Sequence, residues 1–129
     1  MQTIDITMQY PVVITARFEE CKNFYVRNFG FDVLFESDWY VQLKHKSGIE
    51  LAFMKPNLSN QPEFLHSEFG RKGIIITFEV KNAKEEYEKA QKLGDLQIIL
   101  QYVEEEWGQK HFIFEDPAGI FVDIVQQLP

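Results

Sequence analysis

The same succession of secondary-structure patterns occurs twice along this chain, and that repeat limits the folds it can adopt. In the first half, a β-branched run at 12–16 indicates a strand, and apolar residues at helical spacing predict a helix over 19–29 that stops at Gly30. Three further strand patterns follow at 31–35, 39–43 and 49–54, with turn residues between them.

The second half follows the same plan. A strand is predicted over 74–80, and a helix is expected to begin after Asn82, a good N-cap residue, and to end at Leu93-Gly94. Another strand is predicted over 97–103, and a hairpin over 107–126 completes the pattern.

The hairpin is the clearest local signal. Its two apolar arms flank Asp116-Pro117-Ala118-Gly119, in which Asp accepts backbone N–H bonds, Pro presets φ and Gly suits the last position. The sequence therefore predicts a type I turn here.

The repeat predicts an α+β chain of two tandem βαβββ modules. We expect one domain over 1–129, made of a module at 8–55, a linker at 56–70, and a second module at 71–127. Residues 55–61, followed by Pro62, break the pattern and predict a stretch without regular structure, and a short apolar segment with Phe64, Leu65 and Phe69 is expected after it. Helix ends match between the halves, and so does an acidic residue on the last strand of each module, Glu50 in the first and Asp123 in the second.

Those two acids need an explanation, because a lone buried charge on an apolar strand is costly. If the modules are related by a pseudo-twofold axis and both acids face it, the carboxylates converge. Such a pair binds a cation or shares a proton, and two separated carboxylates at wet strand ends are the alternative.

Composition excludes some partners. A net charge of −7, from 20 acidic and 13 basic residues, argues against a nucleic-acid binder. Twelve Phe residues fit either a dimer interface or an apolar ligand cavity. The single Cys21, the absence of a long apolar run and an N-terminus unlike a signal peptide predict a cytoplasmic protein with no membrane partner.

The chain resembles the vicinal-oxygen-chelate superfamily, which includes glyoxalase I, bleomycin-resistance proteins and extradiol dioxygenases. The resemblance covers nearly the whole chain and is carried by motifs whose order and spacing match: Phe24-Tyr25, Phe29-Gly30-Phe31, Glu50-Leu51-Ala52-Phe53 and Asp116-Pro117-Ala118-Gly119. It implies a glyoxalase/bleomycin-resistance-like fold whose sheets curl around a cleft, in a homodimer.

Metal-dependent members of the superfamily carry a His, Glu, His, Glu set. The resemblance places these positions at Tyr10, Glu50, Ile75 and Asp123, so both imidazoles are missing. First-row metals are held chiefly by imidazole and carboxylate. We therefore expect no metal ion and no other cofactor, and the glyoxalase and dioxygenase activities are in doubt.

Several other side chains are candidates for the site. His111 either contacts a ligand, pairs with Asp123 or Glu50, or is a half-exposed strand histidine. Trp39 and Trp107 suit a cleft mouth or a dimer seam. The run 104–106 is expected to be a solvated corner.

Two functions remain open, and a third class, a purely structural dimerisation module, would be favoured if Glu50 and Asp123 were exposed with no cleft between them. The first is a metal-free binder of a small, cationic or aromatic molecule; the alternative is an enzyme of the lyase, isomerase or dioxygenase type with an atypical metal site or a carboxylate base. No catalytic residue is assigned. The predicted ligand-binding residues are Tyr10, Trp39, Glu50, Trp107, His111, Phe121 and Asp123.

Overall fold

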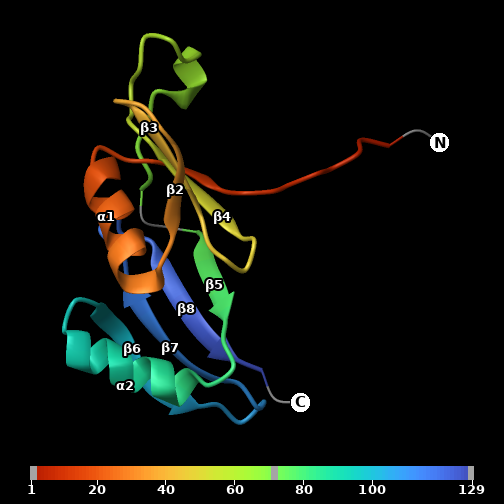
Figure 1. Ribbon diagram of the computed structural model, residues 1–129, viewed down its shortest axis with the longest axis vertical. Helices are drawn as coiled ribbons and strands as arrows, with labels where there is room; N and C mark the ends of the chain where they lie inside the picture. The colour runs from red at the N-terminus through yellow and green to blue at the C-terminus, as the bar shows by residue number, and fades with distance from the viewer. Residues whose placement is uncertain (1–2, 71–72, 128–129) are drawn as a thin grey trace. The chain divides into compact units, whose positions relative to one another are not determined.

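The computed structural model describes residues 3–70 and 73–127, which form two compact units, Met1–Phe69 and Gly70–Pro129 (Figure 1). Each unit has one four-stranded sheet and one α-helix, so the predicted α+β class and the two βαβββ modules are confirmed. The predicted ends of the chain, 1–2 and 128–129, and the first residues of the second module, 71–72, lie outside the described residues.

The first unit has strand order β1-β4-β3-β2, with β1 parallel to β4 and the other pairs antiparallel. Its elements are β1 (Val12–Ile14), α1 (Phe18–Phe29), β2 (Asp32–Glu36), β3 (Tyr40–Lys44), β4 (Glu50–Met54) and the short 3₁₀-helix η1 (Glu63–Leu65).

Helix α1 covers one face of this sheet. Its apolar stripe, Phe18, Cys21, Phe24 and Tyr25, is buried, and the Tyr25 ring stacks on Phe53 of β4 at a centroid distance of 5.6 Å. Gly30 ends the helix in the left-handed conformation at φ 70°, which costs a residue without Cβ little. The core of the unit lies between α1 and β3–β4.

The second unit repeats the arrangement with strand order β5-β8-β7-β6. Its elements are β5 (Ile75–Glu79), α2 (Ala83–Leu93), β6 (Gln97–Glu104), β7 (Lys110–Glu115) and β8 (Phe121–Gln126).

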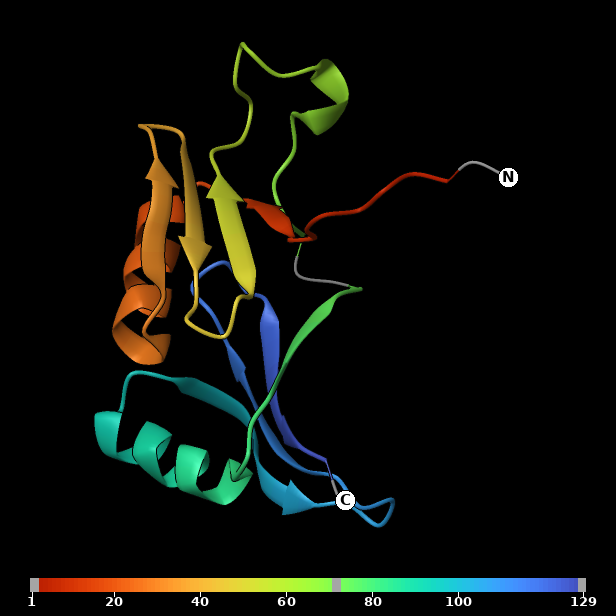
Figure 2. The same cartoon turned by 45° about the vertical axis from the view of Figure 1, so that its right-hand side comes forward.

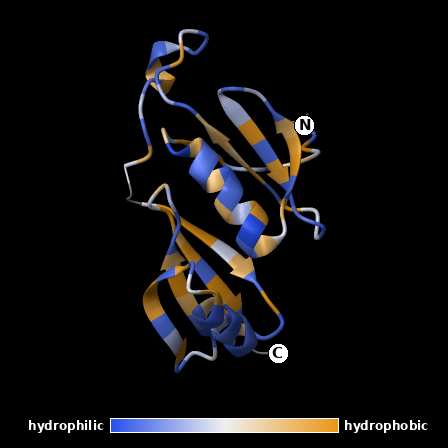
Figure 3. Ribbon diagram, turned by 60° about the vertical axis from the view of Figure 1, so that its left-hand side comes forward, coloured by the Kyte–Doolittle hydropathy of each residue, from blue (hydrophilic) through white to orange (hydrophobic). Residues whose placement is uncertain are grey.

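Helix α2 has the predicted cap but a smaller apolar stripe than α1. The Asn82 side chain accepts a hydrogen bond from the Glu85 backbone N–H at 3.1 Å. Ala83 and Ala90 are the buried residues of the helix, and Tyr87 makes an edge-on ring contact with Phe112 of β7. The outer side of the helix is mostly charged, as its hydrophilic colouring in Figure 3 shows.

The β7–β8 hairpin has the predicted turn. The Asp116 carboxylate is buried and accepts hydrogen bonds from the backbone N–H groups of Ala118 and Ile120, both at 2.9 Å. The Gly119 N–H donates to the Asp116 carbonyl, and Gly119 has φ 87°. One carboxylate thus satisfies two buried donors and holds the hairpin register.

Strand alternation gives each sheet a helix-covered face and an opposite face, here called the open face (Figure 2). In β4, Phe53 points to α1, so Glu50, Ala52 and Met54 point to the open face. In the second sheet, Phe112 points to α2 and is paired with Ile124. Asp123 therefore lies on the open face of its sheet.

Residues 55–62 contain no helix or strand, as predicted, and residues 63–65 after them form the one-turn helix η1. The end of the segment is held against β1, because the Phe69 N–H donates to the Ile14 carbonyl at 2.8 Å. The Glu68 carboxylate also accepts the Ala16 N–H at 2.9 Å. Pro62 starts this turn, and three residues make too short a helix for a periodicity signal.

The helices that the structure describes are all short or polar. None of them has the length and apolar character needed to cross a membrane.

The Asp116 turn yields a stability prediction. Asp116→Ala leaves two buried N–H groups without their acceptor and should lower the free energy of unfolding by about 2 to 4 kcal/mol, measured by urea denaturation. Asp116→Asn keeps a side-chain oxygen at the same place and should cost clearly less. Equal losses in the two variants would contradict this role for the carboxylate.

Candidate functional site

Three side chains of the second unit form a hydrogen-bonded cluster on the open face. His111 of β7 lies between two carboxylates. Its Nδ1 is 2.8 Å from Asp123 Oδ1 on β8, and its Nε2 is 2.9 Å from Glu105 Oε2 at the start of the β6–β7 turn. His111 is only 7% exposed, so it is a buried, paired histidine and not the half-exposed one that was one of the expectations.

The cluster favours the protonated imidazole. A neutral imidazole has one N–H and can donate to only one of the two carboxylates, whereas the imidazolium donates to both. Burial alone lowers the pKa of His111, but the hydrogen bonds and charges of Glu105 and Asp123 outweigh it and raise the pKa above its usual value. His111 is therefore charged over a wider pH range than an exposed histidine.

The first unit has a corresponding cluster around Glu50. The Gln42 side-chain amide on β3 donates to Glu50 Oε1 at 2.5 Å, and the Tyr40 hydroxyl donates to Gln42 Oε1 at 2.8 Å. Tyr10 also hydrogen-bonds with Tyr40. Burial, the Tyr10 hydroxyl and the Glu50 charge together raise the pKa of Tyr40 to about 12. The Tyr40 phenol therefore stays protonated at neutral pH.

The two clusters occupy equivalent places. Glu50 pairs across the sheet with Lys44, and Asp123 pairs with Ile113. Gln42 and His111 each lie two residues before that partner, on the same face, and each binds the carboxylate diagonally. Each unit thus holds its acid with a polar side chain from the adjacent antiparallel strand.

The strand register corrects one position that the resemblance implied. Asp123 pairs with Thr77 of β5, whereas Ile75 pairs with Phe121. The position beside the acid in the second unit is therefore Thr77. The prediction was two residues off because it was counted from a loop, and neither residue supplies an imidazole.

The donor groups present do not fit the metal set of the metal-dependent members. A hydroxyl residue, Tyr10 or Thr77, stands where those members have an imidazole. The one histidine near Asp123 directs both ring nitrogens at carboxylates on its two sides. Within residues 3–70 and 73–127, no three His, Cys, Asp or Glu side chains are arranged to hold a metal ion.

The aromatic candidates fall in different places. Trp39 makes an edge-on contact with Tyr40 at 5.8 Å, which puts it beside the Glu50 cluster. Phe121 lies on the open face, two residues from Asp123 on the same strand. Trp107 is exposed in the β6–β7 turn, and its indole N–H donates to Gln109 Oε1 at 3.0 Å. The structure thus groups Tyr10, Trp39 and Glu50 in one unit, and His111, Phe121 and Asp123 in the other.

Two members of these clusters were missed from the sequence. The alternation of Gln42 with Val41 and Leu43 indicates the polar face of a strand, but nothing in the sequence indicates its contact with Glu50. Glu105 was assigned with its neighbours to a solvated corner, which is wrong for this residue because its carboxylate is half-buried against His111. Only the pairing of β6 with β7, with Val103 opposite His111, brings Glu105 to the histidine.

A sequence model of the glyoxalase-like domain matches residues 8–129, almost the entire chain. The chain belongs to the glyoxalase-like domain family. The resemblance to the vicinal-oxygen-chelate superfamily is thereby confirmed.

Solved structures share the fold of this glyoxalase-like chain. A glyoxalase/bleomycin resistance protein/dioxygenase from Nocardioides has a TM-score of 0.79 at 17% identity, covering 98% of this chain and 87% of that one. A member of the glyoxalase/bleomycin resistance protein/dioxygenase superfamily from Sphaerobacter thermophilus has a TM-score of 0.73 at 19% identity, covering 95% of this chain and 98% of that one. A lactoylglutathione lyase from Agrobacterium tumefaciens has a TM-score of 0.74 at 17% identity, covering 97% of this chain and 96% of that one. No curated protein matches the sequence.

The His111 cluster yields a prediction with a definite sign. Because the folded-state pKa of His111 is raised, its charged form stabilises the fold fully below the unfolded pKa, near 6.5, and the contribution is lost as pH rises through the folded value. The difference in unfolding free energy between the wild type and His111→Gln should therefore be larger at pH 5.5 than at pH 8.5, by urea denaturation.

His66→Gln is the matched control, because His66 hydrogen-bonds the carbonyls of the 56–70 segment and no carboxylate. The difference in unfolding free energy between the wild type and His66→Gln should change less between the two pH values. If the difference in unfolding free energy between the wild type and His111→Gln is constant, or grows with pH, the arrangement of His111 between two carboxylates is contradicted.

Proposed function

We propose that this glyoxalase-like protein binds a small cationic molecule with a flat apolar part at the open face of its sheets, without a metal ion. One observation carries the proposal. In both units, an acid at the equivalent place faces the side opposite the helix and is held in position by a neighbouring polar side chain. A pre-oriented carboxylate binds an ammonium group without the entropy cost of ordering the side chain first.

Glu50 is the better placed of the two acids to bind a cation. Its hydrogen-bond partner Gln42 is neutral, and Tyr10, Tyr40 and Trp39 provide aromatic surface beside it. Flat cationic ligands combine a charge contact with ring stacking, and both contacts are available here. Lys44, opposite Glu50 across the strands, weakens the negative potential and gives an independent way to test it.

The Asp123 cluster also keeps a negative charge. Two carboxylates flank one histidine, so the cluster carries a net charge of about −1 when His111 is protonated and about −2 when it is neutral. Binding of a cation near Asp123 should therefore strengthen as pH rises. The net charge of −7 also attracts cations to the protein.

The second candidate function is an enzyme of this family that uses general acid–base chemistry. The observation that favours it is the Asp123–His111–Glu105 arrangement, since a histidine oriented by a carboxylate is a common proton-transfer device. Elemental analysis of protein purified without chelators separates the metal-dependent version of this candidate from the binder. A stoichiometric transition metal would favour the enzyme.

The proposal predicts a thermal shift. Cationic glycopeptides and planar aromatic amines should raise the melting temperature of the wild type in a concentration-dependent way, because a ligand that binds only the folded state stabilises it. Glu50→Gln should weaken binding of the effective compound about tenfold or more, and Lys44→Gln should strengthen it. Isothermal titration measures both changes.

Asp123→Asn tests whether the second unit contributes, and Glu36→Gln is the matched control because that acid lies on β2 and pairs with Lys22. If no cationic compound shifts the melting temperature, or if Glu50→Gln and Glu36→Gln bind equally well, the binding proposal fails. The proposed cellular setting stays the cytoplasm, supported by the single, buried cysteine.

A further inference from the structure

The turn between β3 and β4 contains a serine hydroxyl that is hydrogen-bonded to a histidine. Ser47 Oγ lies 2.8 Å from His45 Nδ1, and the Ser47 backbone N–H also donates to that nitrogen at 3.1 Å. A ring nitrogen that accepts an N–H bond has no proton of its own, so the proton of the neutral imidazole is on Nε2. The hydroxyl is then the donor to Nδ1. The turn therefore holds an O–H group whose proton faces an imidazole lone pair.

Packing and backbone bonds hold the imidazole in this orientation. The ring of His45 contacts the ring of Phe31 at a centroid distance of 5.3 Å, and Phe31 is only 2% exposed. Two backbone bonds close the turn around it, from the His45 N–H to the Ile49 carbonyl and from the Gly48 N–H to the His45 carbonyl, both at 2.9 Å. A base that is already oriented loses little entropy when it takes a proton from its neighbour.

The second unit has the same turn without a hydroxyl. There Asp116 Oδ1 accepts the Ala118 N–H at 2.9 Å, as His45 Nδ1 accepts the Ser47 N–H. The two backbone bonds that close the turn have counterparts in the second unit, each at 2.9 Å. The glycine that follows has a positive φ in both turns, 99° in the first unit and 87° in the second. Because alanine allows the same turn, the Ser47 hydroxyl is not required to form it.

The two turns differ in their exposure to solvent. Asp116 is 4% exposed and Ala118 is 9% exposed, whereas Ser47 is an exposed residue. Within the first unit, the β3–β4 turn lies at the end of the sheet away from η1 (Figure 2). A small molecule in solution therefore contacts the Ser47 hydroxyl without entering a pocket. An accessible hydroxyl within hydrogen-bond distance of an oriented base is the arrangement that nucleophilic catalysis requires.

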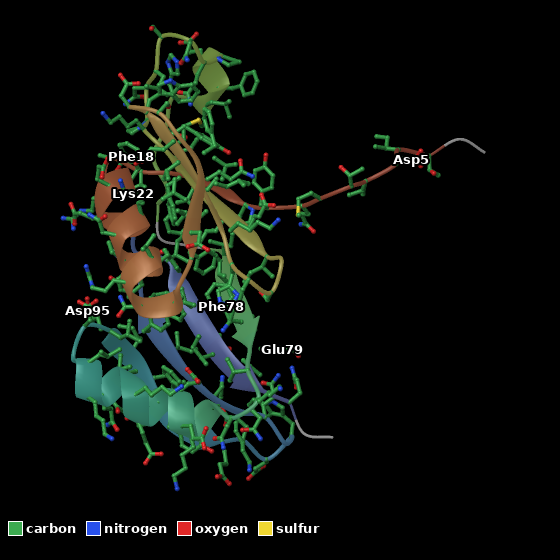
Figure 4. The ribbon with its side chains drawn as sticks, viewed as in Figure 1. Asp5, Phe18, Lys22, Phe78, Glu79 and Asp95 are labelled. Carbon is green, nitrogen blue, oxygen red and sulfur yellow. The ribbon has the colours of Figure 1, made fainter. Side chains whose placement is uncertain are left out.

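The turn is also positively charged. Lys44 and Lys46 flank the histidine, and both are exposed. Among the described residues neither of them has an ion pair, whereas Lys22 of α1, labelled in Figure 4, is bound by Glu36 at 2.6 Å. These ammonium groups make a positive patch on a chain whose net charge is −7. Such a patch attracts small anions.

We propose that Ser47 is a nucleophile activated by His45, and that it accepts the acyl group of small anionic acyl donors of the acyl phosphate class. Ser47 Oγ attacks the carbonyl carbon, and its proton passes to His45 Nδ1. The bond between that carbon and the phosphate oxygen breaks, and phosphate leaves with the electron pair. The products are an acyl ester of Ser47 and inorganic phosphate. This inference does not depend on the ligand proposed for the open face.

The Ser47 backbone N–H has a second role in this reaction. Once Nδ1 holds a proton it no longer accepts that N–H, which is then free to donate to the oxyanion on the attacked carbonyl. Lys44 and Lys46 add positive charge near the leaving phosphate. Hydrolysis of the ester by water, with His45 again as the base, restores the hydroxyl.

A fluorophosphonate tests the nucleophile, because an activated serine forms a stable phosphonate ester with it and releases fluoride. Peptide mass spectrometry should place the label on Ser47, and Ser47→Ala should remove it. His45→Asp keeps an acceptor like that of the second unit but lacks the imidazole, so the labelling rate should fall about tenfold or more. Ser37→Ala is the matched control and should not change the rate, since Ser37 Oγ accepts the Trp39 N–H at 3.3 Å in a turn without histidine.

Acetyl phosphate tests the class of donor. Incubation with acetyl phosphate should slow subsequent fluorophosphonate labelling of the wild type. Hydroxylamine cleaves serine esters but not acetylated lysines, so it should restore the labelling. Lys44→Gln with Lys46→Gln should weaken the protection by acetyl phosphate about tenfold, because the attraction of the anion is lost. The same double substitution should affect labelling by the uncharged fluorophosphonate much less.

Each contrary result has a definite meaning. If Ser47 is not labelled, or if the wild type and His45→Asp are labelled at equal rates, the nucleophile and base pair is overturned. If acetyl phosphate gives no protection, or protection that hydroxylamine does not reverse, the acyl transfer is overturned. Circular dichroism shows whether His45→Asp folds. If it does not, His45→Gln retains a side-chain oxygen to accept the Ser47 N–H and should show the same loss of labelling.

Discussion

Each sheet in this protein has one face that a single helix covers, and the positions of the other groups follow from that burial. In the first unit Tyr25 stacks on Phe53, and in the second Tyr87 meets Phe112 edge-on. Once those residues face the helix, strand alternation directs Glu50 and Asp123 to the opposite side. Burial of aromatic rings under the helices therefore decides where the charges of the open faces lie.

The carboxylate on the open face of each sheet is stabilised by a different kind of hydrogen-bond partner. The first unit uses the neutral amide of Gln42, whereas the second uses His111 backed by Glu105. Both side chains come from the equivalent place on the adjacent antiparallel strand, so the two units share this geometry but differ in the chemistry of the partner. The result is one acid with a constant environment and one whose environment changes with protonation.

Local signals explain what was predictable. Gly30 and Gly94 end their helices, Asn82 caps one, and the Asp116 turn forms as expected, because each depends on neighbours within a few residues. Gln42 and Glu105 were not predicted, since their roles depend on which strands pair and in what register. The choice of Ile75 instead of Thr77 as the residue beside Asp123 has the same origin, because no residue near β5 in the sequence indicates its register with β8.

The sequence by itself determined the duplicated βαβββ order, the family and the two acids, because alternation, capping and turn residues are encoded over short stretches. Only the tertiary structure decided that His111 is buried between two carboxylates and that Tyr10, Tyr40 and Gln42 link to Glu50. The physical reason is that hydrogen bonds across strands, and the edges left without them, depend on register, which is set when distant segments pair.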